Sequence, residues 1–226
     1  MGELSIASLL RQLPYFTTVT EEHLHTLAQN AIHHSYSSGQ IIFQEGDPSS
    51  GLLIVVEGHV KAFKLSPDGQ EYILSLFGPG DIFNDLAALD NLPNVASTMA
   101  VTDVKVWMIP PQDFASALQA DHELCLAVLS GLARRTRNLV SRLSDLALRP
   151  VTTRVARFLL EQIKDPALAH PTVTRTLIAN YLATTPESIS RSLRALEAAG
   201  AIQFDRHRII IINQEELHQQ AQLSPN

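Results

Sequence analysis

Hydrophobic positions change their spacing several times along this chain. Up to about residue 30, leucines recur at helical spacing around a break at Pro14. From His34 to about Ile109 the pattern changes to short apolar runs separated by turn residues, such as the run 41–43 before Glu-Gly-Asp-Pro. Strands at such regular spacing predict a small antiparallel barrel or jelly roll.

A long helix is predicted next, from about Asp121 to Leu148. Its apolar residues recur in alternating steps of four and three, which is a heptad seam over roughly three repeats. The seam consists of Cys125, Leu129, Leu132, Thr136, Leu139, Leu143 and Leu146. The helix could simply pack on its own barrel. A second apolar side, formed by Leu126, Val128 and Val140, favours two partners and hence a homodimer. Gly131 is a local weakness and a point where another segment can approach closely.

The pair Arg149-Pro150 ends that helix and acts as the expected hinge. Three helices are predicted after it, over about 151–164, 174–183 and 186–199, with Gly200 as the C-terminal stop of the last. Residues 203–213 predict a hairpin that turns near Asp205-Arg206-His207. This order of elements is typical of a winged helix-turn-helix.

The most informative stretch opens the last of these helices. Thr185 is a good N-cap, and Pro186 falls at the first helical position. Glu187, Ser190 and Arg191 then share one face. Arginine can bind guanine O6 and N7 with two hydrogen bonds, and glutamate can accept from cytosine N4, so this face suits base reading in a major groove. The plainer interpretation is that Glu187 stabilises the helix N-terminus and Arg191 is solvated.

Further polar residues nearby are candidates for contacts with the DNA backbone. They are Thr174, Arg175, Thr185, Ser188, Ser192, Arg194, Arg206 and Arg208. The predicted fold class is therefore α+β in three parts: a barrel with N-terminal helices at 1–120, a dimerisation helix at 121–149 and a winged helix-turn-helix at 150–226.

Composition adds limits to this picture. The chain has 226 residues, of which 45% are apolar, so a packed core is expected. The net charge is −6, divided into +1 from Pro150 onward (eight basic and seven acidic residues) and −7 before it. One cysteine excludes an internal disulfide and a cysteine-rich metal site within one chain. No signal pattern and no apolar run of membrane length is present, so a cytoplasmic protein is expected.

Together these features resemble the CRP/FNR family of bacterial transcription regulators, over nearly the whole chain. Short motifs occur in the family's order: Glu57-Gly58-His59-Val60, Asp68-Gly69-Gln70-Glu71, Gly80-Asp81-Ile82-Phe83 and Ala133-Arg134-Arg135. The resemblance implies a cyclic-nucleotide-binding-like sensor domain and a homodimer on a palindromic DNA operator, with RNA polymerase as a partner. An effector at the junction of barrel and dimer helix would rotate the DNA-binding domains.

The base-reading triplet resembles the FNR-type head, because Ser190 stands where the cyclic-AMP branch usually has glycine. The implied operator is an inverted TTGAT–ATCAA repeat. Asn84-Asp85 and Val95-Ala96 stand where the family holds ribose and phosphate with Gly-Glu and Arg-Ser. Without that arginine the cyclic phosphate has no charged partner, so cyclic AMP is not expected. The N-terminus also has no cysteine cluster for iron and sulfur.

Without these polar groups, the junction of the barrel and the dimer helix is predicted to be apolar. Its expected lining is Phe83, Leu86, Met99, Leu139, Val140 and Leu143. This lining, with Leu92-Pro93-Asn94, resembles the Dnr/NnrR branch, whose members respond to nitric oxide. That resemblance implies haem as the cofactor, with His33, His34, His59 and His122 as the nearest candidate ligands.

Three alternatives stay open at this point. They are a ligand-independent FixK-like activator, a sensor of another small molecule, and a cupin-like metalloenzyme. The last would need clustered histidine and carboxylate ligands, which the spacing does not supply.

Overall fold

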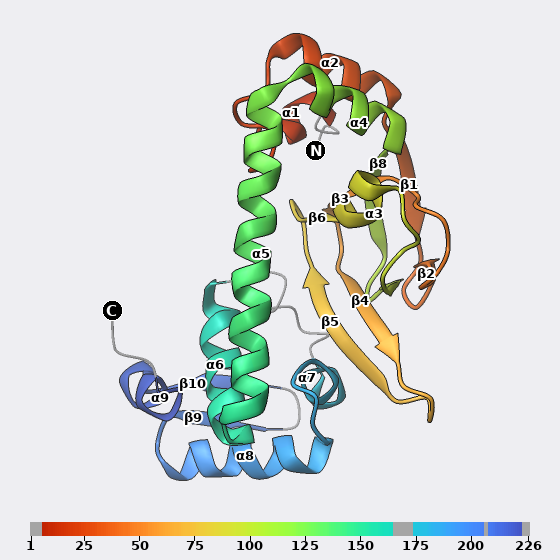
Figure 1. Ribbon diagram of the computed structural model, residues 1–226. Helices are drawn as coiled ribbons and strands as arrows, with labels where there is room; N and C mark the ends of the chain where they lie inside the picture. The colour runs from red at the N-terminus through yellow and green to blue at the C-terminus, as the bar shows by residue number, and fades with distance from the viewer. Residues whose placement is uncertain (1–5, 165–173, 206–207, 223–226) are drawn as a thin grey trace. The chain divides into compact units, whose positions relative to one another are not determined.

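The structure is a computed structural model that describes residues 6–164, 174–205 and 208–222, excluding the side chains of 162–164 (Figure 1). Its helices are α1 Ile6–Leu10, α2 Glu21–Asn30, α3 Asp85–Asp90, α4 Pro111–Ala120, α5 His122–Leu148, α6 Val151–Lys164, α7 Arg175–Tyr181, α8 Pro186–Ala198 and α9 Gln214–Gln220. Its strands are β1 Ile32–Tyr36, β2 Ile41–Phe43, β3 Leu52–Glu57, β4 Val60–Leu65, β5 Glu71–Phe77, β6 Ile82–Phe83, β7 Ser97–Ala100, β8 Val104–Ile109, β9 Ile202–Phe204 and β10 Ile209–Ile211.

The chain forms two compact units. One contains residues up to Lys64 together with Ser75–Asn138, and the other contains Leu65–Leu74 together with Leu139–Asn226. The boundary falls within the β4–β5 hairpin and within α5, so both of these elements contribute to each unit. The tip of the hairpin therefore belongs with the C-terminal helices rather than with the rest of its sheet.

The N-terminal unit is built around two four-stranded sheets. Their strand orders are β1-β8-β3-β6 and β2-β7-β4-β5, and the recorded pairings are antiparallel. Strand β3 reads Leu-Leu-Ile-Val-Val and is almost wholly buried, because it lies inside its sheet and is covered on both faces. Phe16, Leu24 and Leu27 from the N-terminal segment join this core. The antiparallel jelly-roll architecture predicted from the strand spacing is confirmed.

Helix α5 is one continuous element, as Figure 1 shows. Leu124, Val128 and Gly131 form its buried side. The close approach predicted at Gly131 is confirmed, because a Cβ atom there would overlap the ring of Tyr15. The helix ends before Pro150, which cannot continue the backbone hydrogen bonding of a helix.

In the C-terminal unit, α8 packs against both α6 and α7, and β9 pairs with β10 in a short hairpin. Ile189, Leu193 and Leu196 recur at helical spacing and form the buried side of α8. Gly200 ends the helix with a φ of 76°, the left-handed conformation that glycine adopts without strain. The turn predicted near Asp205 lies partly outside the described residues, at 206–207. The winged helix-turn-helix is confirmed.

Candidate nucleic-acid interface

The N-terminus of α8 has the local structure that its sequence predicts. Thr185 has an extended backbone, and its hydroxyl accepts a hydrogen bond from the Ser188 amide at 3.3 Å. Pro186 follows at the first helical position, where no amide hydrogen is needed. Glu187 and Arg191 are exposed and Ser190 is half-buried, so the predicted triplet lies on an accessible face.

Hydrogen bonds connect the side chains of this face. Nη2 of Arg191 donates to Oγ of Ser188 at 3.1 Å, and Oγ1 of Thr185 lies 3.2 Å from the same oxygen. The hydroxyl of Ser190 donates to the carbonyl of Pro186 at 2.9 Å, which leaves its oxygen lone pairs to accept from a ligand. The predicted triplet is thus supplemented by Thr185 and Ser188, which hold Arg191 to the helix cap.

Glu187 is ionised on this face. Hydrogen bonds from its own backbone amide and from Thr185, followed by the charge of Arg191, hold the pKa of Glu187 below its ordinary value. An anion at this position also interacts favourably with the N-terminal end of the helix dipole. Ionised carboxylates only accept hydrogen bonds, so Glu187 can address a base amino group.

The residues predicted to contact the DNA backbone differ in their exposure and in their hydrogen bonds within the protein. Thr174 caps α7 by accepting from the Leu177 amide at 3.1 Å, and Arg194 is exposed. Arg175 lies over the Phe204 ring at 5.4 Å and donates to the Asp205 carbonyl at 2.9 Å, which joins α7 to β9. Arg208 is exposed beside the turn. Arg206 lies outside the described residues.

Ser192 requires a correction. It is only 4% exposed, and its hydroxyl is bonded to that of Thr152 on α6 at 3.2 Å. Its side chain therefore faces the interior of the C-terminal unit toward α6, so the predicted phosphate contact of Ser192 is wrong. The helical period already indicated this, because position 192 lies between the buried Ile189 and Leu196 on the same face.

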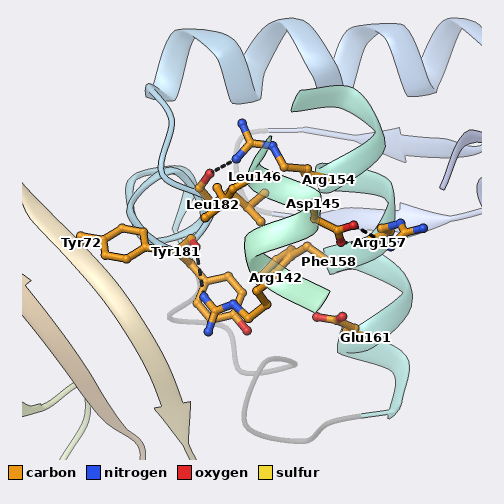
Figure 2. Close-up of a pocket in the computed structure, with 10 residues that line it drawn as sticks. All are labelled: Tyr72, Arg142, Asp145, Leu146, Arg154, Arg157, Phe158, Glu161, Tyr181 and Leu182. Carbon is orange, nitrogen blue, oxygen red and sulfur yellow. Dashed lines mark hydrogen bonds and ion pairs between the residues drawn. The ribbon is translucent and has the colours of Figure 1, made fainter. Parts of the chain in front are cut away.

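A pocket in the same unit is bordered by residues of β5, α5, α6 and α7 (Figure 2). It is lined by Tyr72, Arg142, Asp145, Leu146, Arg154, Arg157, Phe158, Glu161, Tyr181 and Leu182. Arg142 from α5 lies over the Tyr181 ring at 4.2 Å and donates to the carbonyls of Leu74 and Tyr181. One arginine thus joins the hairpin tip, α5 and the end of α7. The sequence did not predict this role of Arg142, because no local pattern shows which arginine of a helix will contact distant segments.

The residues predicted to line an effector pocket fall in both compact units. In the N-terminal unit, Phe83 is buried and stacks on Phe43 and Phe77 with ring centroids 6.3 and 5.3 Å away. Met99 is half-buried and Leu86 is exposed. The other three belong to the C-terminal unit and are exposed, and they are Leu139, Val140 and Leu143.

Asp85 is a buried carboxylate that sequence reasoning did not pair with its partners. It is 2% exposed, accepts a hydrogen bond from the Tyr15 hydroxyl at 2.9 Å and forms an ion pair with Arg135. Burial, followed by the charge of Asp85, raises the pKa of Tyr15 to about 12. The mid-helix Gly131 was the one available signal, because it makes room for Tyr15.

The candidate haem ligands come from three places in the N-terminal unit: His33 and His34 are neighbours on β1, His59 directly precedes β4, and His122 begins α5. His33 packs edge-on against Trp107 at 5.1 Å, and His34 stacks on Tyr36 at 6.2 Å. His122 is exposed at the start of α5. Within the described residues, no group of three or more histidine, cysteine, aspartate or glutamate side chains is arranged to hold a metal ion.

No described helix combines the length and apolar character needed to cross a membrane.

Comparisons with known proteins agree with this arrangement. Residues 33–121 match the cyclic nucleotide-binding domain, and residues 153–220 match the Crp-like helix-turn-helix domain. The chain is 31% identical to the protein named "Probable transcriptional regulator flp" from Lacticaseibacillus casei, over 76% of this chain and 79% of that one. It is 28% identical to the CRP-like cAMP-activated global transcriptional regulator of Mycobacterium tuberculosis, over 82% and 86%.

Among solved structures, FixK2 from Bradyrhizobium japonicum superimposes with a TM-score of 0.74 at 28% identity, covering 84% of this chain and 96% of that chain. The chain belongs to the CRP/FNR family of transcription regulators, with a cyclic nucleotide-binding domain followed by a Crp-like helix-turn-helix. The two curated relatives are named as transcriptional regulators, and the Crp-like helix-turn-helix domain of this chain makes it a DNA-binding regulator of that class.

Proposed function

We propose that this chain is a homodimeric transcription regulator that reads an inverted TTGAT–ATCAA repeat with two copies of α8. The observation that carries the proposal is the accessible face of Glu187, Ser190 and Arg191 on a capped helix within a winged helix-turn-helix. Arg191 and Glu187 address the two bases of one G·C pair, and Ser190 addresses a neighbouring base. RNA polymerase is the proposed partner at the promoter.

Gel-shift titration of the full chain with the palindrome tests this reading. Arg191→Ala is expected to weaken operator binding by about 1–3 kcal/mol for each half-site. The wild-type chain should lose the same binding free energy on a palindrome changed at the G·C pair. The Arg191→Ala variant should bind the changed and unchanged palindromes with equal affinity. Arg194→Ala is the matched control for base reading, because Arg194 is a candidate backbone contact on the same helix, and its loss should weaken binding to both palindromes equally. Equal affinity of Arg191→Ala and wild type for the operator would refute the proposal.

The dimer is proposed to form along an exposed stripe of α5. Leu126, Leu129, Ala133, Thr136, Val140, Leu143 and Ala147 are all exposed and recur in steps of three and four. This stripe shares Leu129, Thr136 and Leu143 with the predicted seam and moves the remaining positions by one residue. Leu132 packs on the core of its own unit, and Cys125 donates to the Leu118 carbonyl at 3.0 Å, so both are engaged within the chain.

A charge in the stripe tests the dimer. Leu143 is 65% exposed, so Leu143→Glu costs the monomer little and places a carboxylate in the proposed interface. Sedimentation should then show a monomer with weakened operator binding. Ser141→Glu, at an exposed position off the stripe, is the control. A wild-type chain that sediments as a monomer at micromolar concentration would overturn the dimer.

Cyclic AMP does not fit the residues of the sensor domain. Several relatives are named as cAMP-activated, but here Val95 is exposed and Ala96 is buried, and neither side chain can bind a phosphate. Asp85, which aligns with the family's ribose-binding residue, already holds Tyr15 and Arg135. Calorimetric titration should show no binding of cyclic AMP at micromolar concentration, and a measured micromolar Kd would contradict this part of the proposal.

A hydrophobic effector is proposed in its place, with haem-bound nitric oxide as the candidate. The support is the apolar character of Phe83, Leu86 and Met99 in the N-terminal unit, together with the FNR-type triplet in a chain that has a single cysteine. Titration of the purified chain with haem should give a Soret band at one equivalent per chain. Absence of a stoichiometric band would remove haem.

A ligand-independent activator is the second candidate, and one observation favours it. The Asp85 carboxylate is satisfied by side chains of its own chain, from the N-terminal segment and from α5. Transcription with purified RNA polymerase separates the candidates. A ligand-independent protein changes transcript yield from the palindromic promoter without any addition, whereas an effector-dependent one requires the effector.

A further inference from the structure

We propose that Ser188 is a positioning residue that sets base discrimination by holding the guanidinium of Arg191. The proposal rests on the DNA-reading function proposed above. It adds Ser188 to Glu187, Ser190 and Arg191 as a residue that determines which base pair is preferred. Ser188 was expected to contact the DNA backbone. In the free protein its hydroxyl oxygen accepts a hydrogen bond from Nη2 of Arg191 at 3.1 Å.

The hydrogen bond is anchored on the helix cap. Ser188 lies three residues before Arg191, so both project from the same face of α8. Oγ1 of Thr185 lies 3.2 Å from the Ser188 hydroxyl oxygen and also accepts from the Ser188 amide at 3.3 Å. The position of the Ser188 side chain is thus fixed at its backbone and at its hydroxyl, and Arg191 is fixed through it.

This fixing matters because a free arginine has many conformations. An immobilised arginine loses rotamer entropy, and a side chain held before binding avoids part of that loss. The guanidinium has five N–H donors, and Ser188 uses one of the two on Nη2. A second hydrogen on Nη2 and both on Nη1 remain, so two parallel donors can still address O6 and N7 of guanine.

A phosphate contact and a positioning role for Ser188 have different consequences. Loss of a phosphate contact weakens binding uniformly across DNA sequences. Loss of a positioning contact weakens binding only where Arg191 meets its G·C pair, and costs nothing further once Arg191 is gone. The two roles therefore separate in a double-mutant cycle on matched and altered DNA.

The experiment uses the full chain with sites selected from random-sequence DNA, so that the operator is measured rather than assumed. Ser188→Ala should weaken binding to the selected site about fivefold for each half-site, with no change at a site altered at the G·C pair. Ser188→Thr keeps the hydroxyl and should bind like wild type. In an Arg191→Ala background, Ser188→Ala should have no effect. Uniform loss across both sites, or additive loss in the double variant, would overturn the proposal.

A second measurement tests the contact without DNA. Nitrogen-15 relaxation at Nε of Arg191 should report a less ordered side chain in Ser188→Ala than in wild type, and an unchanged order parameter would overturn the proposed contact. The failure of the two proposals is distinguishable. A wild-type chain that enriches no DNA site refutes the DNA-reading function, whereas a wild-type site that Ser188→Ala binds equally well refutes only the role of Ser188.

Discussion

Replacing Arg142 by alanine is expected to loosen the C-terminal unit. Arg142 projects from α5, donates to the Tyr181 carbonyl and lies over the Tyr181 ring (Figure 2). It also donates to the carbonyl of Leu74. Tyr181 in turn packs on Phe158 of α6, with ring centroids 5.4 Å apart. Loss of the guanidinium therefore removes contacts from the hairpin tip and from α7 at the same time.

The magnitude follows from these contacts. A hydrogen bond with a charged donor contributes about 1.5–3 kcal/mol net, and the bond to Tyr181, at 3.4 Å, belongs at the low end. The cation–π contact adds about 1 kcal/mol, since the guanidinium is only half-buried. Because the freed carbonyls regain water in part, we expect a total of about 2–3 kcal/mol. That equals roughly a 30- to 150-fold increase in local opening.

Hydrogen exchange measured by mass spectrometry localises this effect. Amides of α7 and of the hairpin tip at 65–74 should exchange faster by that factor in Arg142→Ala, while amides of the N-terminal sheets should be unchanged. Arg137→Ala is the matched control, because it removes an exposed arginine from the same helix. If both variants exchange alike at α7, the bridging role assigned to Arg142 is wrong.

Four further outcomes are expected. Gly131→Ala should destabilise the N-terminal unit by about 1–3 kcal/mol despite the better helix propensity of alanine, because its Cβ overlaps the Tyr15 ring, and Tyr15→Ala should abolish that cost in thermal unfolding of the double variant. Because the pKa of Tyr15 is raised to about 12, its stabilisation is complete below pH 10 and lost as the pH rises through about 12, so Tyr15→Phe should flatten stability over that range. Because the pKa of Glu187 is depressed, operator affinity should not lose the Glu187 contribution between pH 7 and 5, and a loss there that Glu187→Gln removes would contradict the assignment. Thr185→Ala should destabilise α8 by about 1 kcal/mol in urea unfolding through loss of its cap.

Local patterns sufficed where the relevant interaction lies within a few residues in sequence. The cap at Thr185, the stop at Gly200 and the period of Ile189, Leu193 and Leu196 are of this kind, so α8 was predicted almost to the residue. The helix at 151–164 was predicted for the same reason, since Pro150 fixes its start. Heptad counting on α5 was less decisive, because apolar residues on two sides fit more than one seam.

Contacts between distant segments could not be read from the chain. Gly131 predicted that another segment approaches the helix closely, but only the structure shows that this segment contains Tyr15. The Tyr15 hydroxyl donates to Asp85, which also forms an ion pair with Arg135. Ser192 was predicted to lie on the surface, but α6 packs against it and its hydroxyl is bonded to that of Thr152. Which side of α5 remains exposed depended likewise on which residues its own core had already buried, such as Val128.

The sequence by itself determined the order of the elements, the jelly roll followed by a winged helix-turn-helix, and the shared accessible face of Glu187, Ser190 and Arg191. These features follow from hydrophobic period and backbone preference, which act over one or two turns of chain. Only the tertiary structure decided that Ser188 holds Arg191, that Arg142 joins three elements, and that Asp85 is satisfied internally. The reason is physical: a hydrogen bond depends on direction and on a distance of about 3 Å, and only the folded chain sets those for side chains with several rotamers.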